Sequence, residues 1–194
     1  LKIKKLYAVL IHNPLFLQKD KKMRIYKSLE DLKMKGLVKK IGFSIYSTSD
    51  LDFLYKGYKI DIIQLPINLI DRSFADSNWL KKLKKDNVEI HGRSIFLQGL
   101  LLTSISKKFD SFSKWKKLWI NYHKWLSKNN LKPLDACLSY VRSVSEITKI
   151  VVGVDSVKQL EEIYREKTKF NLVFPKYVKS SDVNLVNPSR WINK

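Results

Sequence analysis

The strongest constraint on the fold of this chain is an alternation of short apolar runs with segments whose apolar residues recur at helical spacing. Residues 6–11, Leu-Tyr-Ala-Val-Leu-Ile, form a continuous apolar run, which is typical of a strand buried on both faces. Met23, Tyr26, Leu29 and Leu32 then recur three positions apart among charged residues, which predicts an amphipathic helix. Strands that alternate with helices along a chain build parallel sheets.

The same alternation repeats along the sequence. Strands are predicted near residues 6–12, 39–44, 60–65, 88–94 and 149–154, and the third is expected to stop at Pro66. Helices are predicted over 23–37, after the capping cluster 48–50, from Trp79, through the aromatic segment 112–125, over 133–144 and from Ser156 to Lys167. No glycine-rich G-x-G-x-x-G loop is present, which disfavours a Rossmann-type sheet. We therefore expect an α/β fold, a partial (β/α)8 TIM barrel with about five parallel strands and the helices outside.

Two segments depart from the repeating pattern. Trp115, Trp119, Tyr122 and Trp125 recur at helical spacing, which is typical of core packing or of a lid over a site, and we favour packing. The C-terminal residues contain a serine pair and an Asn-Pro step, which are typical of irregular structure. We expect residues 1–175 to form the barrel part and residues 176–194 to form an irregular C-terminal tail.

The net charge of +20 raises nucleic-acid binding as a function class. Only six of the 38 basic residues are arginine, however, and the lysines are spread along nearly the whole chain, whereas phosphate and base recognition depends on arginine. We therefore expect no specific nucleic-acid binding. No apolar run approaches the roughly 20 residues that a membrane-spanning helix needs, so no membrane association is expected. Because Cys137 is the single cysteine, we expect a buried thiol in a protein of the reducing cytoplasm.

Five short motifs follow one another at the predicted strand ends. They are residues 10–14 (Leu-Ile-His-Asn-Pro), 36–44 (Gly-Leu-Val-Lys-Lys-Ile-Gly-Phe-Ser), 63–71 (Ile-Gln-Leu-Pro-Ile-Asn-Leu-Ile-Asp), 93–101 (Arg-Ser-Ile-Phe-Leu-Gln-Gly-Leu-Leu) and 151–162 (Val-Val-Gly-Val-Asp-Ser-Val-Lys-Gln-Leu-Glu-Glu). In this order and spacing they resemble strands four to eight of the aldo-keto reductase family. The resemblance covers roughly residues 6–170. It implies a TIM barrel that transfers a hydride between a nicotinamide cofactor and a carbonyl substrate.

The resemblance also implies a role for the first motif residues. His12, at the end of the first predicted strand, would hydrogen-bond the substrate carbonyl and orient it, so it is the expected catalytic residue. Ser44 and Gln64 would hydrogen-bond the nicotinamide carboxamide, although Ile45 stands where the family commonly has an asparagine. Arg93 occupies the position where many relatives place a tyrosine stacked on the nicotinamide, and a guanidinium plane can also stack on such a ring.

The remaining cofactor contacts would come from two later motifs. Along the pyrophosphate path the resemblance places Ser94, Phe96, Gln98 and Gly99. Where NADP-preferring relatives hold the adenosine 2′-phosphate it places Gly153, Val154, Asp155 and Gln159, and Glu162 would contact the adenine amine. Asp155 repels a phosphate whereas Lys158 attracts one, so the expected cofactor is NADP or NAD. The three histidines lack metal-ligand spacing, and no metal is expected.

The register of the resemblance leaves part of the family's barrel unaccounted for. If His12 ends strand four, strands one to three are expected to lie outside this chain, together with the family's catalytic Asp, Tyr and Lys. Tyr7 lies inside a predicted strand and cannot replace them. We therefore predict an oxidoreductase that acts on a small-molecule carbonyl. The chain is expected to be truncated and inactive alone, and to pair with a missing N-terminal half-barrel or with itself. The alternative is a non-catalytic aldo-keto reductase-like binding module.

Overall fold

One parallel sheet sets the architecture of the chain. The computed structural model describes residues 3–18, 23–165 and 172–191. Five strands form the sheet in sequential order: β1 (Leu6–Ile11), β2 (Val38–Ser44), β3 (Ile62–Pro66), β4 (Glu89–Arg93) and β5 (Lys149–Ile150). Every neighbouring pair is parallel. The predicted α/β fold with five parallel strands in chain order is therefore confirmed.

Two of the predicted strands differ from the structure by more than one residue at an end, since β3 begins at Ile62 and β5 is much shorter than predicted. β3 runs through Pro66 instead of stopping before it, because Pro66 pairs with Arg93 of β4 and the ladder to β4 does not need a proline N–H. β5 covers two residues instead of six. Its neighbour β4 ends at Arg93, and the N–H of Val151 makes the last bond between the two segments, to the carbonyl of Gly92 at 2.8 Å. Apolar composition alone led to the longer prediction.

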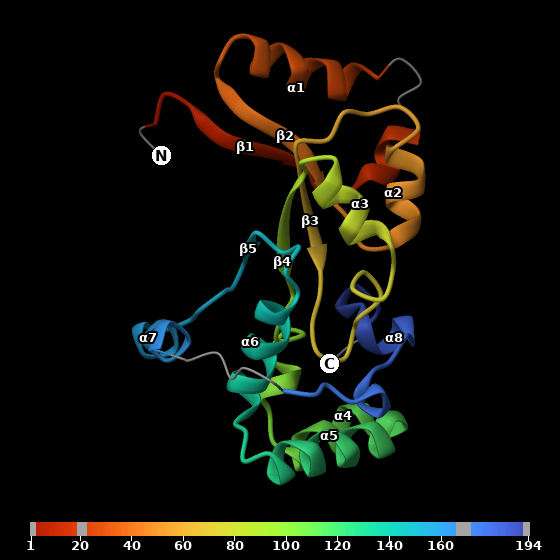
Figure 1. The fold of residues 1–194 in the computed structure, drawn as a ribbon, viewed down its shortest axis with the longest axis vertical. Coiled ribbons are helices and arrows are strands. Elements are labelled where there is room, and N and C mark those ends of the chain that lie inside the picture. The colour runs from red at the N-terminus through yellow and green to blue at the C-terminus, as the bar shows by residue number, and fades with distance from the viewer. Residues whose placement is uncertain (1–2, 19–22, 166–171, 192–194) are drawn as a thin grey trace.

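Helices pack against the apolar face of the sheet, and others lie beyond its carboxyl end (Figure 1). They are α1 (Arg24–Met34), α2 (Thr48–Leu54), α3 (Trp79–Lys85), α4 (Ile105–Phe112), α5 (Lys116–Lys128), α6 (Pro133–Ser143), α7 (Val157–Arg165) and α8 (Val183–Val186), with 3-10 turns at Pro14–Gln18, Leu100–Leu102, Ser113–Trp115, Lys176–Val178 and Pro188–Arg190. α4 and α5 lie beyond the carboxyl end of β3, and α7 stands on the opposite side of the molecule from α2. Among the described segments, no helix has the length and apolarity needed to cross a membrane.

Three helix predictions need adjustment. The aromatic segment forms two helices, α4 and α5, instead of one. Ser47 is the N-cap of α2, so the predicted capping cluster 48–50 forms the first turn of that helix. The end predicted for the last helix, Lys167, lies outside the described residues.

The two faces of the sheet differ in chemistry because side chains alternate along each strand. Alternate residues of the central strands form the apolar core, and each of them is at most 2% exposed: Ile41, Phe43, Ile63, Leu65 and Ile90. The residues between them lie on the other face and are mostly polar: Lys40, Ser44, Gln64, Glu89, His91 and Arg93. Burial of the apolar face stabilises the sheet by roughly 2 kcal/mol for each large side chain. The polar face therefore carries the side chains that can bind a ligand or take part in a reaction.

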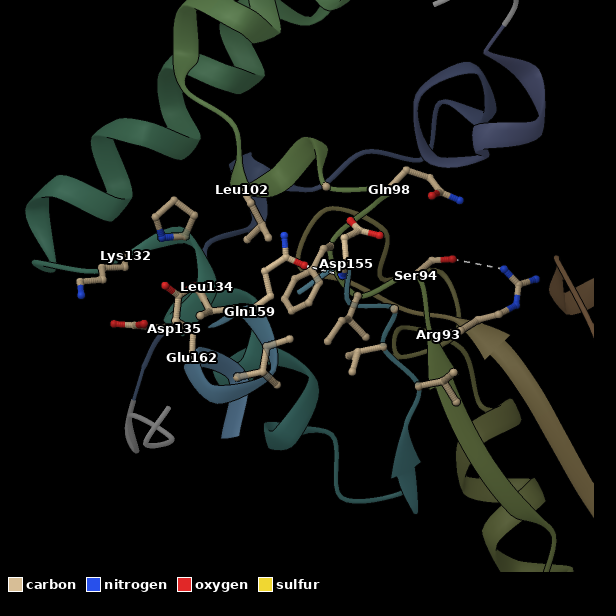
Figure 2. Close-up of a pocket in the computed structure, with 18 of the residues that line it drawn as sticks. Arg93, Ser94, Gln98, Leu102, Lys132, Leu134, Asp135, Asp155, Gln159 and Glu162 are labelled. Carbon is tan, nitrogen blue, oxygen red and sulfur yellow. Dashed lines mark hydrogen bonds between the residues drawn. The ribbon is translucent and has the colours of Figure 1, made fainter. Parts of the chain in front are cut away.

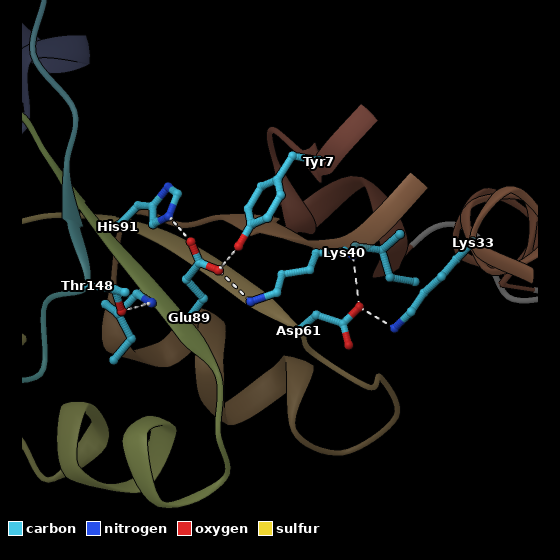
Figure 3. A network of polar contacts seen from close by, with 9 residues as sticks. Tyr7, Lys33, Lys40, Asp61, Glu89, His91 and Thr148 are labelled. Carbon is cyan, nitrogen blue, oxygen red and sulfur yellow. Dashed lines mark hydrogen bonds and ion pairs between the residues drawn. The ribbon is translucent and has the colours of Figure 1, made fainter. Parts of the chain in front are cut away.

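A partly buried ion-pair network crosses the polar face near the amino ends of the strands (Figure 3). Glu89, the first residue of β4, is 7% exposed and accepts hydrogen bonds from the Tyr7 hydroxyl at 2.5 Å and from Lys40 Nζ. Its other carboxylate oxygen lies 2.6 Å from His91 Nε2. Burial acts to raise the pKa of Glu89, but the bonds from Lys40, Tyr7 and His91 outweigh it and lower that pKa to about 2. The network ties β1, β2 and β4 together.

The region beyond the carboxyl end of the sheet has its own packing. Trp119 and Tyr122 of α5 are fully buried, which confirms the core-packing interpretation of the aromatic stripe. Arg72, 8% exposed in the loop after β3, donates hydrogen bonds to the carbonyl oxygens of Phe174 at 2.9 Å and Pro175 at 3.1 Å. These bonds hold the C-terminal segment against the rest of the fold.

Candidate functional site

The expected site residues lie toward the carboxyl end of the sheet. His12 follows the last residue of β1, Ser44 ends β2, Arg93 ends β4, and Gly153 lies three residues beyond β5. Gln64 is the third of the five residues of β3 and is in register with Ser44. Loops that follow neighbouring parallel strands meet at this edge, which is where α/β folds of this kind build their sites.

A cavity of about 970 Å³ opens at this edge, between the loops after β4 and β5 and the start of α6 (Figure 2). Nine of the thirteen residues predicted from the sequence line it: Arg93, Ser94, Phe96, Gln98, Gly99, Gly153, Asp155, Gln159 and Glu162. Lys132, Pro133, Leu134 and Asp135 complete the wall on the α6 side. This volume is at the upper end of the range for small-molecule sites.

Four of the predicted residues lie outside the cavity wall, namely His12, Ser44, Gln64 and Val154. His12 is exposed, and Val154 is 38% exposed. Ser44 is 4% exposed, and within the described part of the chain its hydroxyl has no hydrogen-bond partner. Buried hydroxyls normally have a hydrogen-bond partner, so the Ser44 hydroxyl at the end of β2 is available to bond a ligand.

A proline in the neighbouring strand explains the placement of Arg93. The N–H of Ile45 donates to the Gln64 carbonyl at 2.9 Å, so the Ile45 carbonyl faces Pro66, which has no N–H to donate. Arg93 Nη2 donates to that carbonyl instead, at 3.0 Å. Burial lowers the pKa of Arg93 below its ordinary value. Its Nε is buried without a hydrogen-bond partner among the described residues, so the guanidinium is fixed but not fully satisfied.

Tyr46 connects Arg93 to His12, and sequence reasoning did not identify it. The Arg93 guanidinium carbon lies 4.4 Å from the centroid of the Tyr46 ring, which is a cation–π contact. The Tyr46 hydroxyl oxygen lies 3.5 Å from His12 Nε2. The N–H of Tyr46 donates to the Asp50 carboxylate at 2.9 Å, which also accepts the N–H of Ser47 at 3.0 Å. The start of α2 therefore places Tyr46, and the row from His12 to Arg93 leads to the rim of the cavity.

The loop after β4 has an unusual left-handed backbone where it lines the cavity. The angle φ is positive at Ser94 (57°), Leu97 (48°), Gln98 (52°) and Gly99 (81°). A residue other than glycine adopts this region at a cost of about 1 kcal/mol or more. Asn68, which is 1% exposed, helps to hold the loop through a bond from its amide to the Ser94 carbonyl at 3.3 Å. Strain of this kind concentrates at ligand sites.

The turn into α7 forms another wall of the cavity. Ser156 Oγ accepts the N–H of Gln159 at 3.2 Å, which confirms the predicted helix cap. The side-chain oxygen of Gln159 accepts the N–H of Asp155 at 2.8 Å, so the glutamine is held across the turn. Lys158, the positive charge expected near this turn, does not line the cavity.

Asp135 adds a carboxylate that the sequence did not mark as a site residue. It lies in the first turn of α6, is 7% exposed, and has one carboxylate oxygen buried without a partner in the described part of the chain. Acids are common in the first turn of a helix because they interact favourably with its free N–H groups. Nothing in the sequence therefore separates Asp135 from an ordinary helix-start residue.

Sequential parallel strands, outer helices and a cavity among the carboxyl-end loops define part of a TIM-type barrel. The sequence model of the Aldo/keto reductase family matches residues 1–178. This chain belongs to the aldo/keto reductase family. No curated protein sequence matches it.

Solved structures show the same fold. The holo form of an aldo-keto reductase from Bacillus halodurans aligns with a TM-score of 0.69 at 15% identity, over 92% of this chain and 61% of that one. Its apo form aligns with a TM-score of 0.65 over 90% and 60%. A glycerol dehydrogenase from Gluconobacter oxydans aligns with a TM-score of 0.53 at 18% identity, over 83% and 57%. The chain thus spans about 60% of the length of the Bacillus structures, and the expected partial barrel is confirmed.

Proposed function

We propose that this chain is the cofactor-binding part of an aldo-keto reductase, which transfers a hydride between NAD(P)H and a small carbonyl compound. The observation that carries the proposal is the cavity at the carboxyl edge of the sheet. Its wall combines residues of two motifs, 93–99 and 153–162, which are more than fifty residues apart in the sequence and which both resemble cofactor-binding segments of the family.

The residues present fit a nicotinamide dinucleotide. Arg93 Nε and the Ser44 hydroxyl are buried polar groups without a partner in the described chain, and both lie at the carboxyl ends of their strands. The carboxamide of a nicotinamide offers both donors and acceptors to such groups. Arg93, whose guanidinium carbon lies 4.4 Å from the Tyr46 ring centroid, would stack on the nicotinamide ring. Gly99 and Gly153 have open space where a Cβ would lie, so the backbone is accessible there. The cofactor, when bound, supplies or accepts the hydride.

His12 would position the carbonyl substrate in this scheme. It is exposed at the end of β1, and its Nε2 lies beside the Tyr46 hydroxyl at the Arg93 side of the site. A hydrogen bond from the imidazole to the carbonyl oxygen would polarise it and hold it for hydride transfer. We infer that the proton for that oxygen comes from the family's Asp, Tyr and Lys constellation, on the part of the barrel that this chain does not span.

Cofactor binding tests the proposal directly. Titration of the chain with NADH and with NADPH should produce saturable changes in the fluorescence of the reduced nicotinamide. Arg93→Met should weaken binding roughly tenfold, because it removes one cation–π stack and one charged hydrogen-bond donor. Arg190→Met is the matched control, since Arg190 is exposed in the C-terminal segment away from the cavity wall. If neither dinucleotide binds, or if both variants behave alike, the proposal is wrong.

Turnover measurements test whether cofactor binding and proton donation reside on different parts of the barrel. The 194-residue chain should reduce aldehydes at no more than background rate, since positioned acid catalysis contributes roughly 10²–10⁴-fold and its donor is absent in this scheme. The chain joined to the three preceding β/α units should turn over. His12→Ala in that protein should lower the rate more than it weakens dinucleotide binding. Turnover by the 194-residue chain alone would contradict this division.

A further inference from the structure

The cavity has a marked charge asymmetry along its length. Figure 2 shows Arg93 at one end and Asp135, Glu162 and Lys132 at the opposite end, with Gln159 between them. Three carboxylates line the wall beyond Arg93, those of Asp135, Asp155 and Glu162. The two ends therefore select for different chemistry.

The positive groups at the far end do not balance these carboxylates. Lys132 and Arg165 both line the cavity there. Arg165 Nη2 lies 3.2 Å from a carboxylate oxygen of Glu161, so its charge is already paired. Lys132 is exposed at the N-cap of α6 and carries a flexible, strongly hydrated ammonium group. Lys158 lies outside the wall. Among the described groups, this end thus offers one unpaired cation, Lys132, against two carboxylates, Asp135 and Glu162.

The orientation of a dinucleotide in the cavity follows if the proposed function is correct. The reacting nicotinamide must lie near His12, and His12 is linked through Tyr46 to Arg93. An extended dinucleotide with its nicotinamide at Arg93 then places its adenosine half toward Asp135 and Glu162. The adenosine ribose and adenine amine would lie where the wall is acidic.

We propose that this site takes NAD(H) in preference to NADP(H), and that Asp135 and Glu162 select against the 2′-phosphate. Carboxylates are acceptors only, so they suit the 2′- and 3′-hydroxyls of a ribose and the amine of adenine, all of which donate. Asp135 lines the cavity from the first turn of α6, and one of its carboxylate oxygens has no hydrogen-bond partner among the described residues. A 2′-phosphate brings a charge of −1.5 to −2 and acceptor oxygens, and it finds carboxylates in place of arginine forks. An acidic side chain on the ribose is also how dinucleotide sites of unrelated folds recognise NAD.

Paired titrations with the two reduced cofactors test this inference. At low ionic strength NADH should bind at least roughly tenfold more tightly than NADPH, as expected for a doubly charged phosphate near carboxylates in a partly hydrated site. Raising the salt concentration to about 0.5 M should bring the dissociation constants of NADH and NADPH closer together, because screening weakens the repulsion between the 2′-phosphate and the carboxylates. Glu162→Gln should narrow the difference between the two affinities, because it removes a charge that repels the 2′-phosphate. Glu162→Lys should bring the two affinities level or invert them.

A matched control and two distinct failures complete the test. Glu146→Gln changes a carboxylate outside this cavity and should leave the ratio unchanged. Asp135→Asn keeps the shape of the buried side chain and should also bring the affinities for NADH and NADPH closer together. This second variant is needed because Glu162 is exposed, so its substitution alone can have little effect on the two affinities. NADPH binding as tight as or tighter than NADH in the unmodified chain overturns the inference alone. No binding of either cofactor overturns the proposed function, and the inference with it.

Discussion

Removal of the Glu89 carboxylate tests the ion-pair network across the sheet. Glu89 is 7% exposed and its pKa is lowered from 4.5 to about 2, in spite of burial, by the bonds from Lys40, Tyr7 and His91. A group whose pKa is lower in the folded state than in the unfolded state stabilises the fold above its unfolded pKa. The difference between 4.5 and 2 corresponds to about 3 kcal/mol at neutral pH. Glu89→Gln should therefore lower the free energy of unfolding by about 2–3 kcal/mol at pH 7.

The pH dependence is the sharper part of this prediction. The gap between the unmodified chain and Glu89→Gln should be constant above about pH 5 and should shrink as the pH falls from 4.5 toward 2. By pH 3 about 2 kcal/mol of it should be lost, since the unfolded glutamate is then protonated and the folded one is not. Urea unfolding followed by tryptophan fluorescence from pH 7 to pH 3 measures the gap. Glu146→Gln, in which a half-buried carboxylate with one serine contact is removed, should lower the free energy of unfolding only slightly at pH 7. A large gap for Glu89→Gln that stays constant down to pH 3 would refute the reasoning.

Two further substitutions test the packing that positions the site. Gly42→Ala should destabilise the chain by more than about 3 kcal/mol or prevent folding, because the added Cβ would lie 1.7 Å from the Ile62 carbonyl oxygen. Gly57→Ala should be tolerated, because nothing lies within 4 Å of its added Cβ. Equal thermal unfolding midpoints for the two variants would contradict this. Arg72→Met should destabilise the chain by about 3 kcal/mol, because it leaves the partly buried carbonyls of Phe174 and Pro175 without donors, and it should speed proteolysis within residues 172–191. An unchanged cleavage rate there would show that the segment is held by other contacts.

Much of the fold was predictable from the sequence because apolar runs and helical spacing mark the elements. The apolar run 6–11 became β1 with the predicted bounds to within one residue, and 38–44 became β2. The prediction that β1 is buried on both faces was wrong, because β1 lies at the edge of the described sheet and its Leu6 and Tyr7 are exposed. β5 was predicted too long because a strand needs a neighbour as well as apolar side chains, and β4 ends at Arg93. Pro66 was expected to end β3, but a proline is tolerated where its missing N–H faces a carbonyl that another side chain can satisfy.

The meeting of the two later motifs was predictable because they follow adjacent strands. Residues 93–99 and 153–162 line one cavity because β4 and β5 are neighbours, while their role in cofactor binding stays a prediction. Tyr46 and Asp135 were missed because their significance lies in tertiary contacts: one joins Arg93 to His12, and the other is buried with an unpartnered oxygen. The charge asymmetry of the cavity likewise depends on α6 and α7 facing the same space.

The most direct test of the central claim is a hydrogen-exchange footprint of the chain with and without saturating NADH. If the cavity at the carboxyl edge of the sheet binds the dinucleotide, exchange should slow at the amides of residues 94–99 and 153–162, the two segments that line it. Amides of α1, which takes no part in the cavity wall, should exchange at the same rate in both states. Unchanged exchange in both cavity segments under saturation, or protection concentrated elsewhere, would contradict the account.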